Sequence, residues 1–356
     1  MIAVLLLILL VLLIAINVPI AVAIAAVALF GTWTEKGIFG FYDAALTIFD
    51  GSTNFPLIAI PLFILAGALM NTSGISRRLI DFTAALIGFV RGGLAMVNVG
   101  VSMFFAEISG SAVADVAAIG SVLIPAMKRK RYSATFAAAV TSSSASLAVI
   151  IPPSIPMILY GALTDASITQ LFVAGIIPGL LGGFLMLCLC HWFAVRYGLP
   201  REEAFSLGRL WSTFKAAGPA LLLPIIILGG IFGGVVTATE GAGLAVVAAL
   251  LIGGFVYREI DLKELHGALI EGVSQTAIVM LLVASSAILG LYLTESEVPQ
   301  QFARWITGVS DNRYIVLMLL NVMLLMLGMI LHGAAAIILI VPIVMPLVQQ
   351  IGVDPI

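Results

Sequence analysis

Two short polar stretches interrupt an otherwise apolar chain of 356 residues, and their residue types could hold a hard cation. One is the Ser-Gly-Ser run at 109–111, and the other surrounds the proline pair in IIPPS at 150–154. Because proline has no amide hydrogen, a helix cannot continue unbroken through the pair, which leaves the carbonyls of the two isoleucines as free acceptors. Unwound backbone commonly coordinates Na⁺ in transporters. Together with the hydroxyls of Ser109 and Ser111, these oxygens predict a cation site.

The same two stretches also suit an anion. Helix N-termini are expected at 112–115 and after Pro153, and each presents free N–H groups at the positive end of a helix dipole. The TSSS run at 141–144 adds hydroxyl groups shortly before the proline pair. We expect the ligands of a carboxylate substrate among five residues: Ser111, Ala112, Ser143, Ser154 and Gly333.

Several of these polar residues also have a purely structural interpretation. The two serines at 109–111 could simply close a tight turn, and the hydroxyls at 141–144 could bond back to carbonyls of their own helix. Asp115 stands in the first turn of a helix, where a carboxylate stabilises the dipole, and Glu240 is interpreted as structural. Glu107 differs, because an acid inside a membrane is a functional candidate by default, although the turn amides would also satisfy it.

Composition indicates what surrounds these stretches. The chain is 62% hydrophobic and 10% charged, with a mean hydropathy of +1.21, so most of its surface must face lipid. A net charge of -2 excludes a broadly basic surface for nucleic acid. The opening 30 residues carry no cleavage signal and predict a retained membrane segment broken near Pro19. The only cysteines, Cys188 and Cys190, are expected to pack in the core rather than form a disulfide or metal site.

Basic residues predict how the chain crosses the membrane. If the loop before Asn54 and the loop with Thr164 and Asp165 face outward, three of the 16 Lys and Arg (Lys36, Arg304 and Arg313) lie outside the membrane and 16 − 3 = 13 lie inside. This excess of basic residues on the inner side supports that orientation. Arg91 and the KRKR run at 128–131 then share a side with 36 residues between them, too few for two full spans. A re-entrant hairpin satisfies both conditions, with arms at 92–107 and 112–127. Its tip at 109–111 must face protein or water rather than lipid.

A faint internal repeat predicts a second hairpin. Residues 63–127 resemble residues 284–348, with Gly110 matching Gly333 (333 − 110 = 223) and Pro125 matching Pro346 (346 − 125 = 221). The second hairpin would have arms at 314–331 and 335–348 and a tip at 332–334, and it would enter from the opposite side. Inverted repeats with broken helices are typical of secondary transporters. The predicted fold is an all-α polytopic membrane protein with two re-entrant hairpins and discontinuous helices.

Several long motifs resemble a known family. These are SGSAVADVAAIGSVLIPAM, the FAAAVT…IIPPSIPMILYG run, SITQLFVAGIIPGLL and LHGAAAIILIVPIVMPLV. They resemble the large membrane (M) subunit of tripartite ATP-independent periplasmic (TRAP) transporters, of the dicarboxylate-permease type, over the whole chain. The resemblance implies a Na⁺-driven elevator transporter in the bacterial inner membrane, with no cofactor besides the coupling ion. It also implies a small four-helix membrane (Q) subunit and a periplasmic binding (P) protein that delivers a C4-dicarboxylate, sialic acid or similar carboxylate.

The resemblance also assigns residues to two Na⁺ sites. The first would use Ser109, Gly110 and Ser111 with Ile151, Pro152 and Pro153, and the second would use His332, Gly333 and Ala334. His332 replaces what is frequently an acid in the family. Family members also continue with a broken helix that carries a Thr-Pro-Pro stretch. By the repeat offset that helix would begin about 20 residues beyond Ile356, so the second site lacks half its ligands here.

The expected organisation alternates static and moving parts. Scaffold helices and an inner arm are expected at 1–91 and 164–275, a second arm at 276–313, and the transport domain at 92–163 and 314–356.

An intramembrane serine protease using Ser109 or Ser111 is a rival, but it would need a histidine base within hydrogen-bond reach. The sequence has no ring of repeated charges and no carbonyl filter motif, which argues against a channel. A stand-alone Na⁺/carboxylate symporter of related architecture remains the serious alternative.

Overall fold

The computed structural model describes residues 2–201, 204–308, 312–329, 331 and 333–356, without the side chains of 2–4, 7, 108 and 109. Within those residues it contains sixteen α-helices and no strand. Six helical segments are long and apolar enough to span a membrane by length and composition: Phe55–Thr72, Ile168–Arg196, Leu207–Phe232, Ala238–Val256, Leu262–Glu295 and Gly333–Gln350. The all-helical, multi-pass part of the prediction is therefore confirmed.

The chain divides into two compact units. Unit 1 comprises Met1–Leu57, Leu159–Ser167 and Gln275–Ile356, and unit 2 comprises Ile58–Ile158 and Ile168–Ser274. Helices α9 (Ile155–Thr164) and α13 (Leu262–Glu295) contribute to both. The other helices of unit 2 are α4 (Ala59–Thr72), α5 (Ile75–Ile87), α6 (Gly93–Ser109), α7 (Ala112–Arg129), α8 (Ala134–Ala145), α10 (Ile168–Arg196), α11 (Leu207–Phe232) and α12 (Ala238–Leu251).

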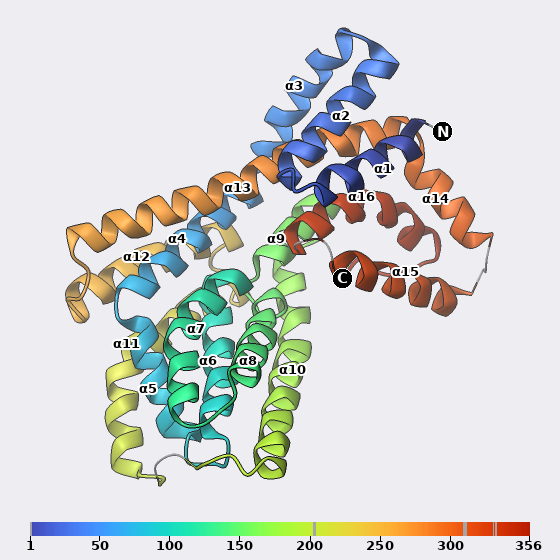
Figure 1. Cartoon of the computed structure of the whole chain (residues 1–356). Coiled ribbons are helices and arrows are strands. Elements are labelled where there is room, and N and C mark those ends of the chain that lie inside the picture. Colours follow the sequence, from blue (N-terminus) through green and yellow to red (C-terminus); the bar gives the residue numbers. More distant parts are fainter. Residues whose placement is uncertain (1, 202–203, 309–311, 330, 332) are drawn as a thin grey trace. The chain divides into compact units, whose positions relative to one another are not determined.

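Two apolar clusters hold unit 2 together. In the first, α4 packs along α12 and α5 packs along α11, with Leu79, Val101 and Leu223 buried between them. The second cluster is formed by α6, α7, α8 and α10 and includes the buried side chains of Ala95, Met127 and Val140. Figure 1 shows α6, α7 and α8 side by side. Between helices in a membrane such side chains stabilise the fold by close van der Waals packing rather than by removal from water. These clusters give the hairpin formed by α6 and α7 a firm support.

Unit 1 contains a helical hairpin and a three-helix cluster. Its other elements are α1 (Ile2–Ala15), α2 (Ile20–Lys36), α3 (Phe39–Ser52), the 3₁₀ helix η1 (Phe55–Ile58) at its boundary, α14 (Val298–Thr307), α15 (Arg313–Gly328) and α16 (Gly333–Gln350). The break between α1 and α2 falls at Pro19, as predicted. Helices α14, α15 and α16 bury Ile306, Val316 and Leu347 together.

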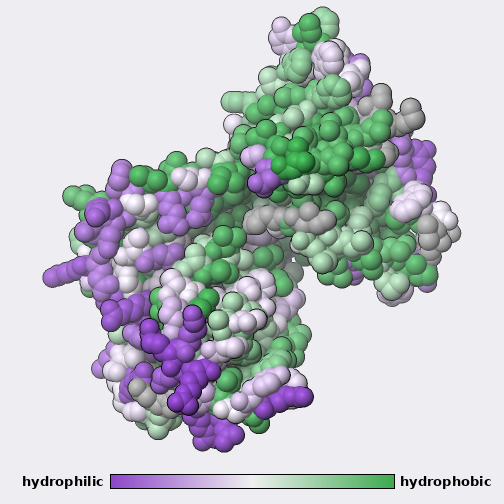
Figure 2. All heavy atoms as spheres, in the orientation of Figure 1, coloured by the Kyte–Doolittle hydropathy of each residue, from purple (hydrophilic) through white to green (hydrophobic). Residues whose placement is uncertain are grey.

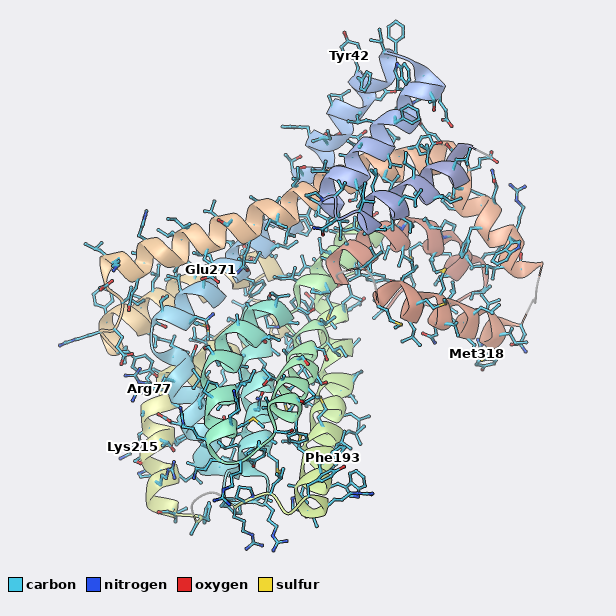
Figure 3. All side chains as sticks on the ribbon, viewed as in Figure 1. Tyr42, Arg77, Phe193, Lys215, Glu271 and Met318 are labelled. Carbon is cyan, nitrogen blue, oxygen red and sulfur yellow. The ribbon has the colours of Figure 1, made fainter. Side chains whose placement is uncertain are left out.

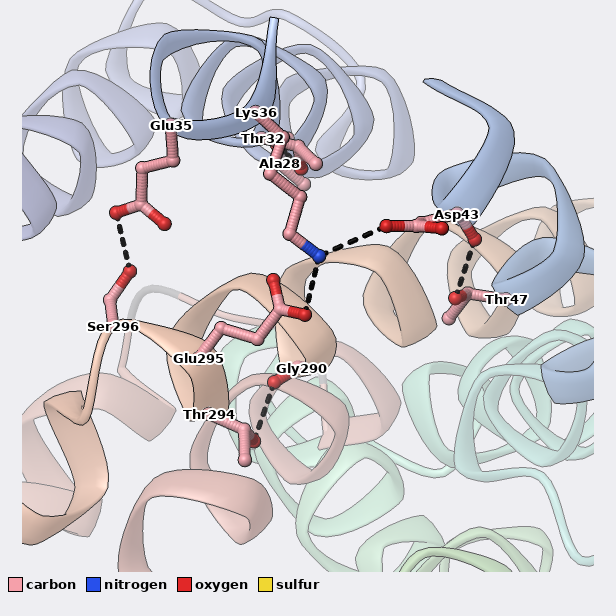
Figure 4. Close-up of polar contacts among 10 residues, drawn as sticks. All are labelled: Ala28, Thr32, Glu35, Lys36, Asp43, Thr47, Gly290, Thr294, Glu295 and Ser296. Atoms are coloured by element: carbon pink, nitrogen blue, oxygen red, sulfur yellow. Dashed lines mark hydrogen bonds and ion pairs between the residues drawn. The ribbon is translucent and has the colours of Figure 1, made fainter. Parts of the chain in front are cut away.

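Polar contacts fix the turn between α2 and α3. The Lys36 ammonium lies 3.0 Å from Asp43 Oδ2 and 2.6 Å from Glu295 Oε1, at the end of α13 (Figure 4). Ser296 Oγ donates to Glu35 Oε1 at 2.9 Å. The hydrogen bonds that Lys36 donates to Glu295 and to Asp43 raise its pKa. The α2–α3 turn is therefore tied to α13 by charge as well as by packing.

The predicted boundaries of the two hairpins have different outcomes. Helices α6 and α7 match the predicted arms within two residues and meet at Gly110 and Ser111. In the second hairpin, α15 ends at Gly328, three residues early, and α16 already begins at Gly333, which was expected in the tip. A helix-starting Gly-Ala-Ala-Ala run has good helix propensity after its first residue, and this explains the earlier start. His332 lies outside the described residues.

Candidate functional site

The tip of the first hairpin is a two-residue turn. Helix α6 ends at Ser109, and Gly110 follows in the left-handed region with φ +57. Ser111 is extended and caps α7, since its Oγ accepts a hydrogen bond from the Ala114 amide at 3.4 Å. Its carbonyl accepts from the Asp115 amide at 3.0 Å. Ser111 therefore has the structural role of closing a tight turn. Whether it also binds a ligand is not tested by this geometry.

The proline pair breaks the next helix as its chemistry requires. Helix α8 ends at Ala145, a 3₁₀ turn (η2) covers Ser146–Val149, and α9 starts at Ile155. The Leu147 carbonyl accepts from the amides of Ile150 and Ile151, at 3.0 and 2.8 Å. The peptide between Pro152 and Pro153 is cis. Ser154 is buried and donates to the Val149 carbonyl at 2.7 Å, which closes the loop on itself.

The hairpin tip and the helix break lie against each other. A Cβ placed on Gly110 would lie 2.9 Å from the carbonyl oxygen of Pro153 and 3.2 Å from the nitrogen of Ile155. Two segments about 40 residues apart in sequence thus bring backbone polar groups together inside unit 2. No group of three His, Cys, Asp or Glu able to hold a metal occurs among the described residues. Carbonyl and hydroxyl oxygens are therefore the atoms at this junction that could coordinate a cation.

A buried polar network lies between α6 and α8. Asn98 Nδ2 donates to Thr141 Oγ1 at 2.7 Å, and Ser144 Oγ lies 2.8 Å from Ser102 Oγ and 3.3 Å from Asn98 Oδ1. All four side chains are at most 1% exposed. Thr141 also bonds back to Ala137, and Ser144 to Thr141, as the structural interpretation of 141–144 expected. Sequence analysis did not single out Asn98 and Ser102, although their spacing of four places them on one helical face.

Helix α10 supports the break from behind. A Cβ on Gly175 would lie 2.5 Å from the Ile150 carbonyl oxygen, and one on Gly179 would lie 2.6 Å from the Ile151 side chain. The α10 backbone therefore approaches the broken loop more closely than any larger residue allows. The spacing of four between these glycines indicates a close helix contact, and the sequence-based prediction missed it.

The remaining predicted residues occupy different environments. Ala112 is half-buried at the start of α7, Ser143 is exposed, and Gly333 and Ala334 begin α16 in unit 1. The described backbone of Ser109 ends α6. The assignment of these residues to Na⁺ and substrate stays a prediction.

Three other predictions outside the junction have clear outcomes. Glu240 forms a capping box with Thr237, which confirms its structural role. Cys188 and Cys190 are both free. Only Cys190 packs in the core, whereas Cys188 is exposed, so that part of the prediction was wrong. Residues two apart on a helix point to different faces, and only one of those faces is covered.

A helical hairpin whose tip touches a broken helix, within a multi-pass membrane protein, is an arrangement found in secondary transporters. Residues 7–356 match the family model described as tripartite ATP-independent periplasmic transporter, DctM component, and the chain belongs to that family. This confirms the resemblance stated from the motifs.

Similar proteins carry names of the same kind. The chain is 39% identical to the isethionate TRAP transporter permease protein of Oleidesulfovibrio alaskensis, over 86% of this chain and 49% of that protein. It is 38% identical to the C4-dicarboxylate TRAP transporter large permease protein of Pseudomonas aeruginosa, over 88% of this chain and 73% of that one. The sialic acid TRAP transporter large permease protein of Vibrio cholerae is 36% identical, with the same coverage. The family and these relatives are transporter permeases, so the chain is a permease and not an enzyme.

Proposed function

We propose that the chain carries out Na⁺-coupled secondary transport of an organic anion, a carboxylate or a similar acid, across the bacterial inner membrane. Relatives are named for C4-dicarboxylate, sialic acid and isethionate, all of which are anionic. The observation that carries the proposal is the contact between Gly110 and the Pro153 carbonyl. It supports a shared site, because oxygen donors of the break lie beside the N-terminus of α7.

The hairpin and the broken helix would move together as the transport domain. A binding protein would deliver the substrate, and a small four-helix membrane subunit would brace the static helices. The family name supports the presence of further components, because it describes a tripartite system. The elevator motion and the two Na⁺ sites, including the one assigned to His332, Gly333 and Ala334, belong to this proposal.

Uptake measured against Na⁺ concentration tests the site. In Ser111→Ala we expect the half-saturating Na⁺ concentration to rise about tenfold, since a contact to a charged group contributes roughly 1.5–3 kcal/mol. Ser121→Ala is the matched control, because Ser121 is exposed on the same helix and donates, within the described residues, to the Ala118 carbonyl of its own helix. Identical Na⁺ dependence in wild type and Ser111→Ala would remove Ser111 from the site.

The same assay separates the proposal from its alternative. Uptake into proteoliposomes should require the binding protein and the small membrane subunit. Full uptake by the chain without either partner would favour a stand-alone Na⁺/carboxylate symporter.

A further inference from the structure

A cavity lined by basic and apolar side chains lies in unit 2, away from the hairpin tip. It has a volume of about 500 Å³ and is lined by Phe89, Val90, Arg91, His191, Val195 and Arg201. These residues come from the α5–α6 connection, the last turns of α10 and the segment that leads to α11. Figure 2 shows hydrophilic residues gathered over this end of unit 2, and Phe193, labelled in Figure 3, marks this end of α10.

The backbone builds the cavity rather than leaving it to flexible side chains. Arg91 and Arg201 form an antiparallel β-bridge, and the Gly92 amide donates to the Pro200 carbonyl at 3.1 Å. Residues directly opposite in such a pair place their side chains on the same face. Gly92 also packs directly on Ala194 of α10, next to Val195. The side chains of Arg91 and Arg201 thus leave the paired backbone on one face and line the same cavity as His191.

These basic side chains have no intramolecular counter-charge in the described part of the chain. Arg91, His191 and Arg201 form no ion pair there, and no described carboxylate lines the cavity. Arginine residues otherwise pair bidentately with carboxylate or phosphate oxygens. The cavity therefore offers several hydrogen-bond donors to one anion.

The other half of the lining indicates which anion. Phe89, Val90 and Val195 are apolar, and Phe89 is held by an edge contact to Phe205 at 5.1 Å between ring centroids. Exposed aromatic rings lie at the same ends of α10 and α11, at Trp192, Tyr197 and Trp211. Aromatic rings of this kind mark the membrane interface, and basic residues gather on its inner side. A free ion would need no apolar wall, whereas a lipid would place its glycerol and first methylenes there.

We propose that this cavity binds the phosphate of an anionic membrane phospholipid at the inner surface, with Arg91 and Arg201 on the phosphate oxygens and His191 beside them. The site is independent of the Na⁺ and substrate site. It would anchor the α5–α6 and α10–α11 connections to the lipid surface.

Lipid binding to the purified chain in detergent tests the proposal. Phosphatidylglycerol is titrated and bound lipid is counted by native mass spectrometry, with phosphatidylcholine and inorganic phosphate as separate arms. Arg91→Gln/Arg201→Gln should weaken phosphatidylglycerol binding at least about tenfold, since charge-assisted hydrogen bonds are lost. Lys128→Gln/Arg129→Gln removes the same charge from exposed residues outside the cavity and should change binding by less than about twofold.

A second variant keeps the charges and fills the space. Val195→Trp should also lose phosphatidylglycerol binding, because the indole occupies the apolar side of the cavity, while thermal unfolding stays unchanged at a half-exposed position. Equal loss in the Lys128/Arg129 control, or inorganic phosphate competing as well as the lipid, would overturn the proposal. Binding that appears only after Glu202→Gln/Glu203→Gln, the two acids next in sequence, would mean that these carboxylates fill the cavity and would also overturn it.

Discussion

Gly110 is the residue on which the junction between hairpin and helix break depends. Its φ of +57 costs a residue with a Cβ about 1–2 kcal/mol. A methyl group there would also meet the Pro153 carbonyl at 2.9 Å. Backbone conformation and close approach thus demand glycine for independent reasons.

Gly110→Ala should therefore lower the midpoint of thermal unfolding in detergent and reduce uptake more than tenfold. Uptake should fall by more than the loss of folded protein explains, because a displaced tip would also move the oxygen atoms that are proposed to bind Na⁺. Gly243→Ala is the control, since its Cβ would meet nothing within 4 Å in helix α12, where alanine is the better helix former. Normal uptake by Gly110→Ala would contradict the tight junction.

A second residue-scale prediction concerns the contact between α5 and the segment after α12. Arg78 Nη2 lies 2.7 Å from Glu259 Oε1, and its guanidinium lies 3.8 Å from the centre of the Tyr257 ring. The Arg78 guanidinium holds the pKa of the Glu259 carboxyl below its ordinary value of 4.5. A lowered folded-state pKa stabilises the fold above the unfolded value, and this stabilisation is lost as pH falls.

Wild-type stability should accordingly decrease as pH falls below about 4.5, through protonation of Glu259. Glu259→Gln should be less stable at pH 7 and should lose less stability than wild type on acidification. The effect is small, because the Glu259 side chain is 45% exposed and solvent screens the pair. Thermal unfolding at pH 7 and pH 4 measures it, and parallel pH dependence in both proteins would exclude this pair as a contributor.

At the scale of elements, α10 sets the position of the helix break. Gly175 lies under the Ile150 carbonyl, where a Cβ would come within 2.5 Å of backbone oxygen. Backbone cannot rotate away as a flexible side chain does, so a larger residue must displace the loop or the helix.

Gly175→Ala should shift the 150–154 loop and lower the apparent Na⁺ affinity together with thermal stability. A shifted core element typically costs about 1–3 kcal/mol. Gly218→Ala in α11 is the matched control, because its Cβ would have no neighbour within 4 Å. If both variants transport like wild type, α10 does not position the loop.

The first hairpin also has a length that matters for the membrane. Helix α6 has 17 residues and α7 has 18. At 1.5 Å per residue each is about 25–27 Å long, which is slightly less than the roughly 30 Å hydrocarbon core. The lengths agree with a hairpin that enters and returns on one side, and this topology stays a prediction.

At the scale of the whole molecule, labelling tests that topology. In a Cys188→Ser/Cys190→Ser background, cysteines introduced at Lys130 and Asp165 should react with an impermeant reagent from opposite sides of the membrane. Lys36→Cys should label from the same side as position 165. Labelling of positions 130 and 165 from one side would refute the re-entrant arrangement.

The amino-acid sequence determined the features that have local causes. The break at the proline pair follows from missing amide hydrogens, the turn at Gly110 from a residue free to adopt positive φ, and the membrane environment from overall composition. Hairpin boundaries were accurate where a Ser-Gly-Ser run interrupts the helix. They were wrong near Gly333, where three alanines extend the helix into the expected tip.

Only the tertiary structure decided which of these segments meet. The Asn98–Thr141–Ser144 network, the contact of Gly110 with Pro153, and the cavity of Arg91, His191 and Arg201 join positions 43 or more residues apart. Helices that are apolar nearly all round carry little periodic signal for the face that packs inward. Small residues such as Gly175 then determine how closely two helices approach. Which small residues come into contact depends on the packing of all the neighbouring helices.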